Sequence, residues 1–321
     1  MCPGLGWIDG DTAVRDNDYV SSHNSPDHAL DLRVLPALGW RALARAHRER
    51  LDRLVGPYLE RRAAGTTHPV IDFLFTYYGN KPSQLRRWHP GFGIGMADAH
   101  DYAGARGYHR VGDAVFTADP AYLAKRRDTI EFVARLLNAT AARPAQLSCF
   151  GLHEWAMVYR TDEVRHQQVP LRLGHAGTDA VVESMSLRCT HFDAFRFFTP
   201  EAVGRNSEPL TRADQLLREQ PGCLHANMDL YKWGFKLAPL ISSDLLLDCF
   251  ELACTARELD MRASPYDLRD LGYEPVRIET PPGRAEYVRA QAAISESAEV
   301  LRDRLRLACT ELSAALERAA A

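Results

Sequence analysis

The sequence lacks several features by which large classes of protein are usually identified. No apolar run approaches the roughly 20 residues of a membrane-spanning helix, so a membrane protein is not expected. The first residues contain neither a basic start nor an apolar signal core, which favours a cytoplasmic protein. Neither sign of charge is in large excess, because the formal net charge is −3. Such a chain has no general attraction for a phosphate backbone, and only a local basic patch would allow nucleic-acid binding.

Cysteine is scarce and poorly spaced for a disulfide framework or a zinc finger. The seven cysteines are an odd number, and no two of them form a CxxC pair. No motif for a nucleotide cofactor is present either. Three cysteines shortly precede a histidine: Cys149 before His153, Cys189 before His191 and Cys223 before His225. Because cysteine is also a common small core residue, packing is the simplest interpretation of all three.

What is present is an ordinary globular composition with strong helical periodicity. The 321 residues are 46% hydrophobic and 25% charged, which is enough for a substantial core. Apolar residues recur at helical spacing over residues 36–62, 119–138, 224–259 (with a break near Pro239) and 286–318. Short strands are predicted at residues 169–174, 181–187 and 188–198, and these would form a small antiparallel sheet. The sequence therefore predicts a helix-dominated α+β domain over residues 36–321, preceded by an irregular arm at residues 1–35.

Two other segments give weaker signals. Residues 91–118 are rich in glycine, and this composition predicts a long loop. His153 and Glu154 are adjacent in the chain. Since adjacent side chains point in different directions in either regular structure, these two are not expected to face one site.

The strongest site signal consists of two histidine–carboxylate pairs within aromatic, core-like runs. His191 and Asp193 lie two residues apart, which places both on one face of a strand. His225 and Asp229 lie four residues apart, which places both on one face of a helix that continues to Lys232. If the two segments converge, His191, Asp193 and His225 can bind one divalent ion of iron, manganese or zinc. Asp229 and Lys232 are then candidate catalytic groups.

Simpler interpretations of both pairs stay open. Asp193 can form a buried ion pair with Arg188 or Arg196, leaving His191 as a satisfied core histidine. The helical stripe that begins at His225 has the spacing of a solvated surface face as well as that of a site.

The aromatic run over residues 68–93 supplies candidate substrate-binding residues. They are Asp72, Tyr77, Arg86, Arg87 and Trp88, to which the later Trp233 is added. The adjacent arginines are suited to grip an anionic or planar substrate. The alternative for Asp72 is a buried ion pair with Arg86, Arg87 or His89.

Two further catalytic candidates, Arg262 and Tyr266, lie in the segment ELDMRASPYDL. Its Ser-Pro step predicts a structured turn that would present both side chains to a ligand. The alternative is an ordinary salt-bridge network at the end of a helix.

Four segments carry a resemblance to a known family: HPVIDFLFTYYGNKPSQLRRWHPGFG, CTHFDAFRFF, GCLHANMDLYKW and DMRASPYDL. Over residues 36–300 the chain resembles a family common in actinobacteria whose members carry the label 3-methyladenine DNA glycosylase. The resemblance implies a DNA N-glycosylase or a nucleobase-recognising protein. In such a protein Tyr77, Trp88 and Trp233 would stack a base. Asp193 or Asp229 would then assist cleavage of the glycosidic bond.

Three functional classes therefore follow from the sequence. The first is an enzyme that performs metal-assisted hydrolysis or oxidation on a small polar substrate. The second is the base-excising protein that the resemblance implies. The third is a binding protein without catalytic activity, in which the buried polar groups only satisfy one another.

Overall fold

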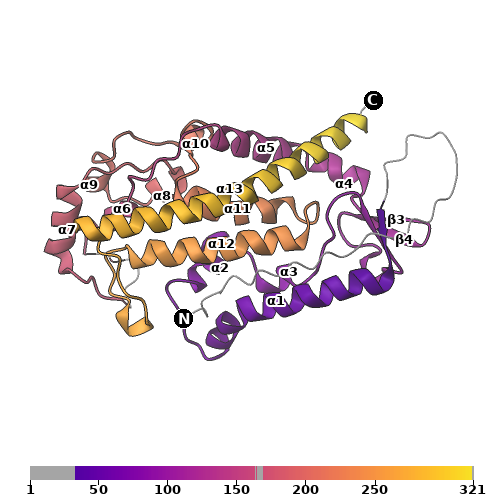
Figure 1. Cartoon of the computed structure of the whole chain (residues 1–321), viewed down its shortest axis with the longest axis horizontal. Coiled ribbons are helices and arrows are strands. Elements are labelled where there is room, and N and C mark those ends of the chain that lie inside the picture. The colour runs from indigo at the N-terminus through magenta and orange to yellow at the C-terminus, as the bar shows by residue number, and fades with distance from the viewer. Residues whose placement is uncertain (1–32, 163, 165–168, 320–321) are drawn as a thin grey trace.

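Three helices from the last third of the chain form the centre of the fold. They are α11 (Leu224–Leu237), α12 (Ser243–Arg262) and α13 (Pro281–Arg318). Figure 1 shows the computed structural model, in which α13 runs along α11 and α12. The helix α5 (Arg127–Ala141) packs on α13, and α1 (Ala37–Ala63) packs on α12. The structure describes residues 33–162, 164 and 169–319.

The remaining elements surround this centre. The helices are α2 (Asp72–Tyr78), α3 (Pro82–Leu85), α4 (Pro120–Lys125), α6 (Leu152–Ala156), α7 (Gly174–Ser184), α8 (Phe192–Phe195), α9 (Pro200–Val203) and α10 (Gln215–Arg218). Short 3-10 turns are η1 (His100–Tyr102), η2 (Arg212–Asp214) and η3 (Arg269–Leu271). The strands are β1 (Arg33–Leu35), β2 (Ile94–Ala97), β3 (Tyr108–Val111) and β4 (Ala114–Thr117).

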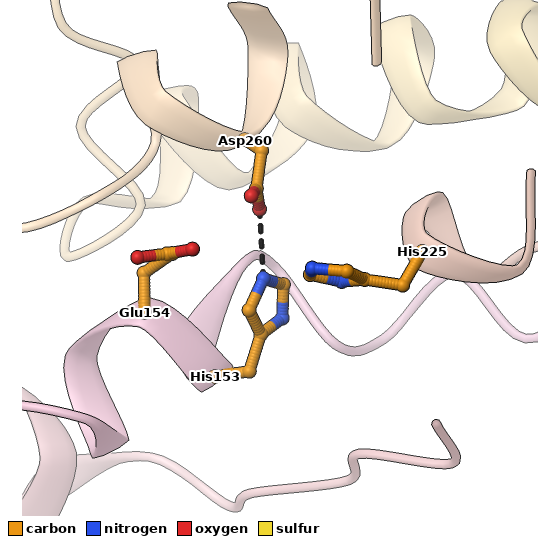
Figure 2. Close-up of side chains that lie close together, drawn as sticks. All are labelled: His153, Glu154, His225 and Asp260. Atoms are coloured by element: carbon orange, nitrogen blue, oxygen red, sulfur yellow. Dashed lines mark hydrogen bonds and ion pairs between the residues drawn. The ribbon is translucent and has the colours of Figure 1, made fainter. Parts of the chain in front are cut away.

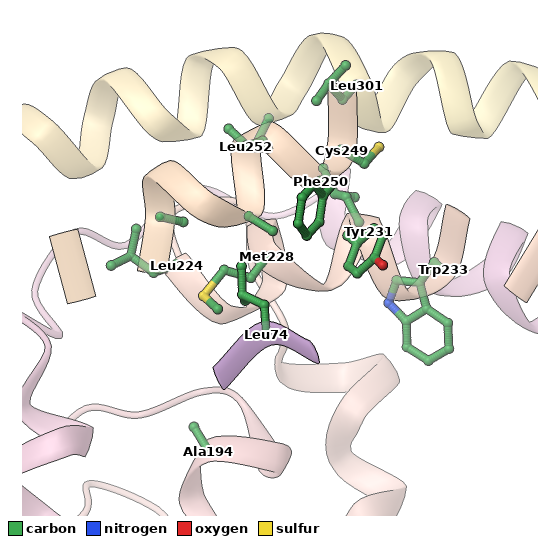
Figure 3. Close-up of a cluster of buried hydrophobic side chains, with 14 of the residues drawn as sticks. Leu74, Ala194, Leu224, Met228, Tyr231, Trp233, Cys249, Phe250, Leu252 and Leu301 are labelled. Carbon is green, nitrogen blue, oxygen red and sulfur yellow. The ribbon is translucent and has the colours of Figure 1, made fainter. Parts of the chain in front are cut away.

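The apolar core lies where α2, α11, α12 and α13 meet (Figure 3). Phe250 of α12 is fully buried, and its ring centroid lies 5.0 Å from that of Tyr231 and 5.5 Å from that of Phe75. Burial of large side chains such as these is the main favourable term in folding. A buried polar contact also joins two of the central helices, because Arg302 of α13 donates to the side-chain oxygen of Asn227 on α11.

The helix predictions are confirmed, with boundaries set by caps and prolines. Asp119 caps α4, since its Oδ1 accepts from the backbone N–H of Tyr122 at 3.0 Å. The helix predicted over 119–138 is divided into α4 and α5 at Arg126. Pro239 lies between α11 and α12 as predicted. The last helix begins earlier than predicted, because Thr280 caps it through the backbone N–H of Gly283.

A helix-dominated α+β fold with a small sheet is confirmed, but the predicted position of the sheet is wrong. Residues 174–184 form α7, and the segment after His191 forms the single turn α8. The segment alternates like a strand, but His191, Ala194 and Phe195 also follow helical spacing, and all three are buried in the structure. Backbone hydrogen bonds from Ala194 and Phe195 to the carbonyl of His191 close the turn.

The sheet is instead built from the glycine-rich segment that predicted a loop. Its order is β1-β2-β4-β3, with β1 and β2 parallel and the other two pairs antiparallel. Gly95 pairs with Phe116, and a Cβ on Gly95 would lie 2.5 Å from the Phe116 ring. The glycine is therefore required by cross-strand packing rather than by a turn. Most of the predicted N-terminal arm lies outside the described residues, and its last part, Arg33–Leu35, is β1.

His89 connects the sheet region to the start of α12. Its backbone N–H donates to Ser243 Oγ at 2.8 Å, and its Nδ1 lies 2.5 Å from Tyr108 Oη. Burial, reinforced by the positive charge of Arg87, lowers the pKa of His89 to about 4. The ring is therefore neutral in the folded protein at neutral pH.

This shifted pKa gives a stability effect with a definite sign. Between pH 6.5 and about 4 the unfolded chain binds more protons at His89 than the folded protein does. The stability that depends on a neutral His89 is therefore complete above pH 6.5 and is lost as the pH falls towards 4. Replacing His89 by Gln should reduce the loss of unfolding free energy over this window by up to about 3 kcal/mol. Urea unfolding at several pH values would measure the difference. His175→Gln, at an exposed position of α7, is the control, and identical pH profiles for wild type and His89→Gln would contradict the expectation.

Candidate metal centre

The helix α11 carries ionisable side chains into the interior of the protein. His225 is 7% exposed and Asp229 is fully buried, so the interpretation of this stripe as a solvated face is wrong. The reason is that α11 is covered on several sides, by α12, α13 and α5. Lys236, one turn beyond Lys232, is the first residue of the stripe to be exposed. Ionisable groups in such surroundings require partners or a ligand.

Four buried residues from three helices converge at the start of α11. They are His153 and Glu154 of α6, His225 of α11 and Asp260 of α12, here called the His153 group (Figure 2). One potential ligand atom from each residue lies within 4.8 Å of the others. In Figure 2 the side chains of α6 approach from one side, Asp260 from the opposite side and His225 from a third direction. This is an arrangement that could hold a metal ion.

The contacts within the His153 group are short and charged. His153 Nε2 lies 2.7 Å from Asp260 Oδ1. The guanidinium of Arg257 bridges the two carboxylates, with Nη1 at 2.9 Å from both Glu154 Oε1 and Asp260 Oδ2. The rings of His153 and His225 meet edge to face, with centroids 4.4 Å apart. The group therefore consists of two imidazoles and two carboxylates, with the permanent cation of Arg257 beside them.

The two histidines of this group are held in opposite protonation states. Burial acts to lower the pKa of His153, but the adjacent Asp260 outweighs it and raises that pKa well above its ordinary value. Burial lowers the pKa of His225 far below its ordinary value, and the neighbouring His153 lowers it further. His225 is therefore neutral, which is the form of imidazole that coordinates metals.

A second cluster lies beside the first. His191, Glu219 and Asp229, here called the His191 group, also place potential ligand atoms within 4.8 Å of one another. His191 Nε2 lies 3.4 Å from Asp229 Oδ2 and 3.5 Å from Glu219 Oε1. His191 is completely buried, yet neither of its ring nitrogens has a hydrogen-bond partner within the described part of the chain. Such a side chain is the kind of exception that an unseen ligand explains.

Lys232 ties the His191 group to Asp193. Its Nζ lies 2.8 Å from Asp229 Oδ2 and 2.9 Å from Asp193 Oδ2. Burial acts to raise the pKa of Asp229, but Lys232 and His191 together lower it below its ordinary value. Asp193 is also bound by Arg212 at 2.8 Å, so it is satisfied by cations and belongs to neither group.

The two groups are neighbours through their histidines. The rings of His191 and His225 are nearly parallel, with centroids 5.3 Å apart. An enclosed cavity of about 10 Å³ lies against both, which is room for about one water molecule. Its walls include all three cysteine–histidine pairs noted in the sequence: Cys149 and His153, Cys189 and His191, Cys223 and His225. Burial raises the pKa of Cys189 and of Cys223, so these thiols stay protonated and the histidines and carboxylates are the better ligands.

An open hollow lies next to this enclosed cavity. Its volume is about 530 Å³, and Arg188 lines both spaces. Phe150 lines the hollow and has a φ of 52°, followed by Gly151 with a φ of 70°. A left-handed conformation costs a bulky residue about 1–2 kcal/mol. The turn therefore stores strain just before α6, where it directs the chain into the His153 group.

The structure separates the predicted substrate-binding residues. Asp72 accepts hydrogen bonds from Arg61 and from the backbone N–H of His68, so its partner is Arg61 and none of the three predicted residues. Arg86 pairs with Asp52 on the surface. These two side chains have structural partners and do not meet at one site.

The predicted aromatic residues lie in different places. Trp88 is buried in a small cluster beside the sheet, together with Trp40 and Tyr102. Trp233 packs in the main core, with its ring centroid 5.5 Å from that of Phe132. Burial and the negative charge of Asp229, a member of the His191 group, raise the pKa of Tyr77.

The last two predicted catalytic residues lie away from both groups. Arg262 donates to the carbonyl oxygen of Glu274 and forms ion pairs with Glu258 and Glu286 at 3.9 and 3.5 Å. This is the helix-end network that was the alternative interpretation. Tyr266 is buried in a separate apolar cluster with Val158 and Leu268.

Sequence reasoning placed His225 at the site but missed His153 and Glu154. The expectation that adjacent His153 and Glu154 would not share a site is wrong, because the short helix α6 is buried all round and long side chains reach back to one point. Glu219 follows a polar helix and carried no signal in the sequence. The usable signal was a cysteine two or four residues before each of three histidines, and all six of these residues line the cavity.

The chain was compared with known proteins in three ways. No protein-family model matches it, no curated protein matches it, and no solved structure matches it. Among the described helices, none has both the length and the apolar character that crossing a bilayer requires.

Arg257 is 1% exposed and compensates two buried carboxylates, so its removal should be costly. We expect Arg257→Met to lower the free energy of unfolding by about 3–5 kcal/mol in chelator-containing buffer. The matched control is Arg50→Met, which removes a half-exposed arginine paired with Asp248 and Glu251. Arg50→Met should lower the free energy of unfolding by about 1 kcal/mol or less. Equal losses for the two variants in denaturant unfolding would contradict this account of the buried network.

Proposed function

We propose that this chain is a metal-dependent enzyme whose metal ion is held by the His153 group. The observation that carries the proposal is the convergence of four buried ligand residues, two imidazoles and two carboxylates, within 4.8 Å. Zinc, manganese and non-haem iron use ligands of these types. Buried carboxylates and histidines are expensive to maintain, and a bound cation offsets that cost.

The charge of the group suits a divalent cation. His153 must give up its proton to bind an ion, because only neutral imidazole coordinates metals. Arg257 then compensates one of the two carboxylate charges of Glu154 and Asp260, which leaves one negative charge for the ion. His225 is neutral and has its ring beside those of both His153 and His191. A divalent ion supplies a Lewis acid and lowers the pKa of a bound water.

The His191 group provides polar side chains beside that ion. Lys232, held between Asp193 and Asp229, is protonated: burial acts to lower its pKa, but Asp229 and Asp193 raise it. It keeps Asp229 ionised, and Asp229 lies 3.4 Å from His191, whose side chain lines the enclosed cavity. Asp229 fixes both Lys232 and the hydroxyl of Tyr78, which donates to Asp229 Oδ1 at 3.0 Å. These contacts orient the groups before a substrate arrives.

The substrate we propose is small and polar, and the reaction is hydrolysis or oxidation. The open hollow of about 530 Å³ is large enough for a small molecule, and Arg188 and Arg284 line it. Since Arg188 also lines the enclosed cavity, it can draw a polar or anionic group towards the histidines.

Elemental analysis of protein purified without chelator tests this proposal. The wild-type chain should carry a stoichiometric amount of zinc, manganese or iron. His225→Ala should lose that metal and its activity with little change in the circular dichroism spectrum, because one of four ligands is removed. The exposed His175→Ala is the control and should keep its metal. Unchanged metal content in His225→Ala would refute the assignment, and release of a methylated base from DNA by a metal-free chain would favour the glycosylase alternative.

A further inference from the structure

A second cavity lies at the other end of α11 from the candidate metal centre. Its volume is about 350 Å³, within the usual range for small-molecule sites. It is lined by residues before and within α4, at the end of α11 and at the start of α12. His225 and Lys236 are eleven positions apart on α11, which corresponds to about 16 Å along the helix. The cavity is therefore distinct from the His153 group.

The cavity is strongly and unusually positive. Four cations line it: Arg87, Arg106, Arg126 and Lys236. No aspartate or glutamate is among its lining residues in the described chain. The same four cations form no ion pair with a carboxylate within the residues that the structure describes, although the protein as a whole is slightly acidic. Cations gathered without counter-charge repel one another, and an anionic ligand would remove that repulsion.

Arg126 is the residue that most directly requires a ligand. It lies at the junction of α4 and α5, where its Nη2 donates to the backbone carbonyl of Lys236. This contact holds the guanidinium between the α4–α5 junction and the end of α11. Its Nε is buried and has no hydrogen-bond acceptor among the described residues. Since this Nε exposes almost no surface, the terminal nitrogens of the guanidinium are the groups that can bind an oxygen of an anion in the cavity.

Part of the cavity lining is aromatic and apolar. Tyr122 and Phe235 contribute rings, and Pro239 adds an apolar surface. The guanidinium of Arg106 lies 5.5 Å from the centroid of the Tyr122 ring, so this cation is positioned over an aromatic face. Tyr122 is held in place because its hydroxyl donates to the carbonyl of Ala238 at 3.3 Å.

We infer that this cavity binds a phosphorylated small molecule with a planar ring, in the size range of a mononucleotide. Arg126 and Lys236 contact the phosphate, because guanidinium and ammonium groups bind its oxygens by charge-assisted hydrogen bonds. Arg87 and Arg106 add positive charge at the exposed rim. The planar part packs on Tyr122 and Phe235. A recessed cavity in a chain of net charge −3 favours a small ligand over a nucleic-acid backbone, which needs an extended basic surface.

Isothermal titration with defined probes tests the inference. The probes are adenosine monophosphate, inorganic phosphate, uncharged adenosine and a short DNA duplex, all at one ionic strength. We expect adenosine monophosphate to bind most tightly, inorganic phosphate more weakly and adenosine very weakly. Arg126→Gln and Lys236→Gln should each weaken binding of adenosine monophosphate at least about tenfold, the effect of one lost charge-assisted hydrogen bond. The exposed neighbour Lys125→Gln, which does not line the cavity, should change it less than about twofold.

A further variant distinguishes a loss of ligand binding from a loss of stability. Since Arg126 also supports the end of α11, Arg87→Gln provides a rim variant whose side chain is exposed and bonds no helix end. It should weaken binding with an unchanged thermal midpoint in the absence of ligand. Absence of binding by any phosphate compound at millimolar concentration would overturn the inference, as would equal effects of Lys125→Gln and Lys236→Gln. Binding of the duplex in preference to adenosine monophosphate would also overturn it. Metal content should be the same in all these variants, so the result does not depend on the proposed metal centre.

Discussion

The burial of charge along α11 is the constraint on which the rest of the structure depends. Asp229 is inaccessible to water, and a lone carboxylate there would be far too costly to retain its charge. Lys232 and Tyr78 compensate it, and Lys232 in turn requires Asp193. Each buried charge thus fixes a partner on another element. The packing of α2 and α8 around α11 follows from these pairings as much as from the apolar contacts.

The same helix carries different chemistry at its two ends. At its start, His225 meets side chains of α6 and α12 and the ring of His191, which directly precedes α8, with Arg257 as the compensating cation. At its end, Lys236 lies with arginines that have no carboxylate partners in the described chain. The histidine–carboxylate cluster and the positive cavity lie on one rigid element and are therefore held at a constant separation, whatever the surrounding loops do.

Periodicity made the long helices predictable, since their apolar positions follow from geometry that each segment carries by itself. The short elements were different. The segment around His191 fits a strand by alternation and a helical turn by its buried positions, and only tertiary contacts decide between them. Gly95 resembled a loop glycine because its true cause, the ring of Phe116, is a neighbour from another strand. Local sequence does not contain that neighbour.

The candidate site was also predicted only in part, because local sequence does not contain the distant partners of a residue. His191, Asp229, His225 and Lys232 do come together, because an ionisable group inside core-like sequence signals a buried cluster wherever the chain folds. Their partners Glu219, Asp260 and Arg257 come from distant helices, and nothing in spacing connects them to α11. Asp72 shows the opposite case, in which a buried carboxylate has only a structural partner, Arg61.

The chamber beside His191 and His225 admits about one water molecule, while the hollow outside it is some fifty times larger. In the function proposed above, Arg188 is the side chain common to both spaces, and only the narrowest end of a substrate in the hollow can pass it towards the histidines. Selection among substrates at such a narrow entrance depends on the width of the end that enters first, and hardly on the size of the rest of the molecule. Unrelated compounds that share one slender terminus would then compete for the same inner position.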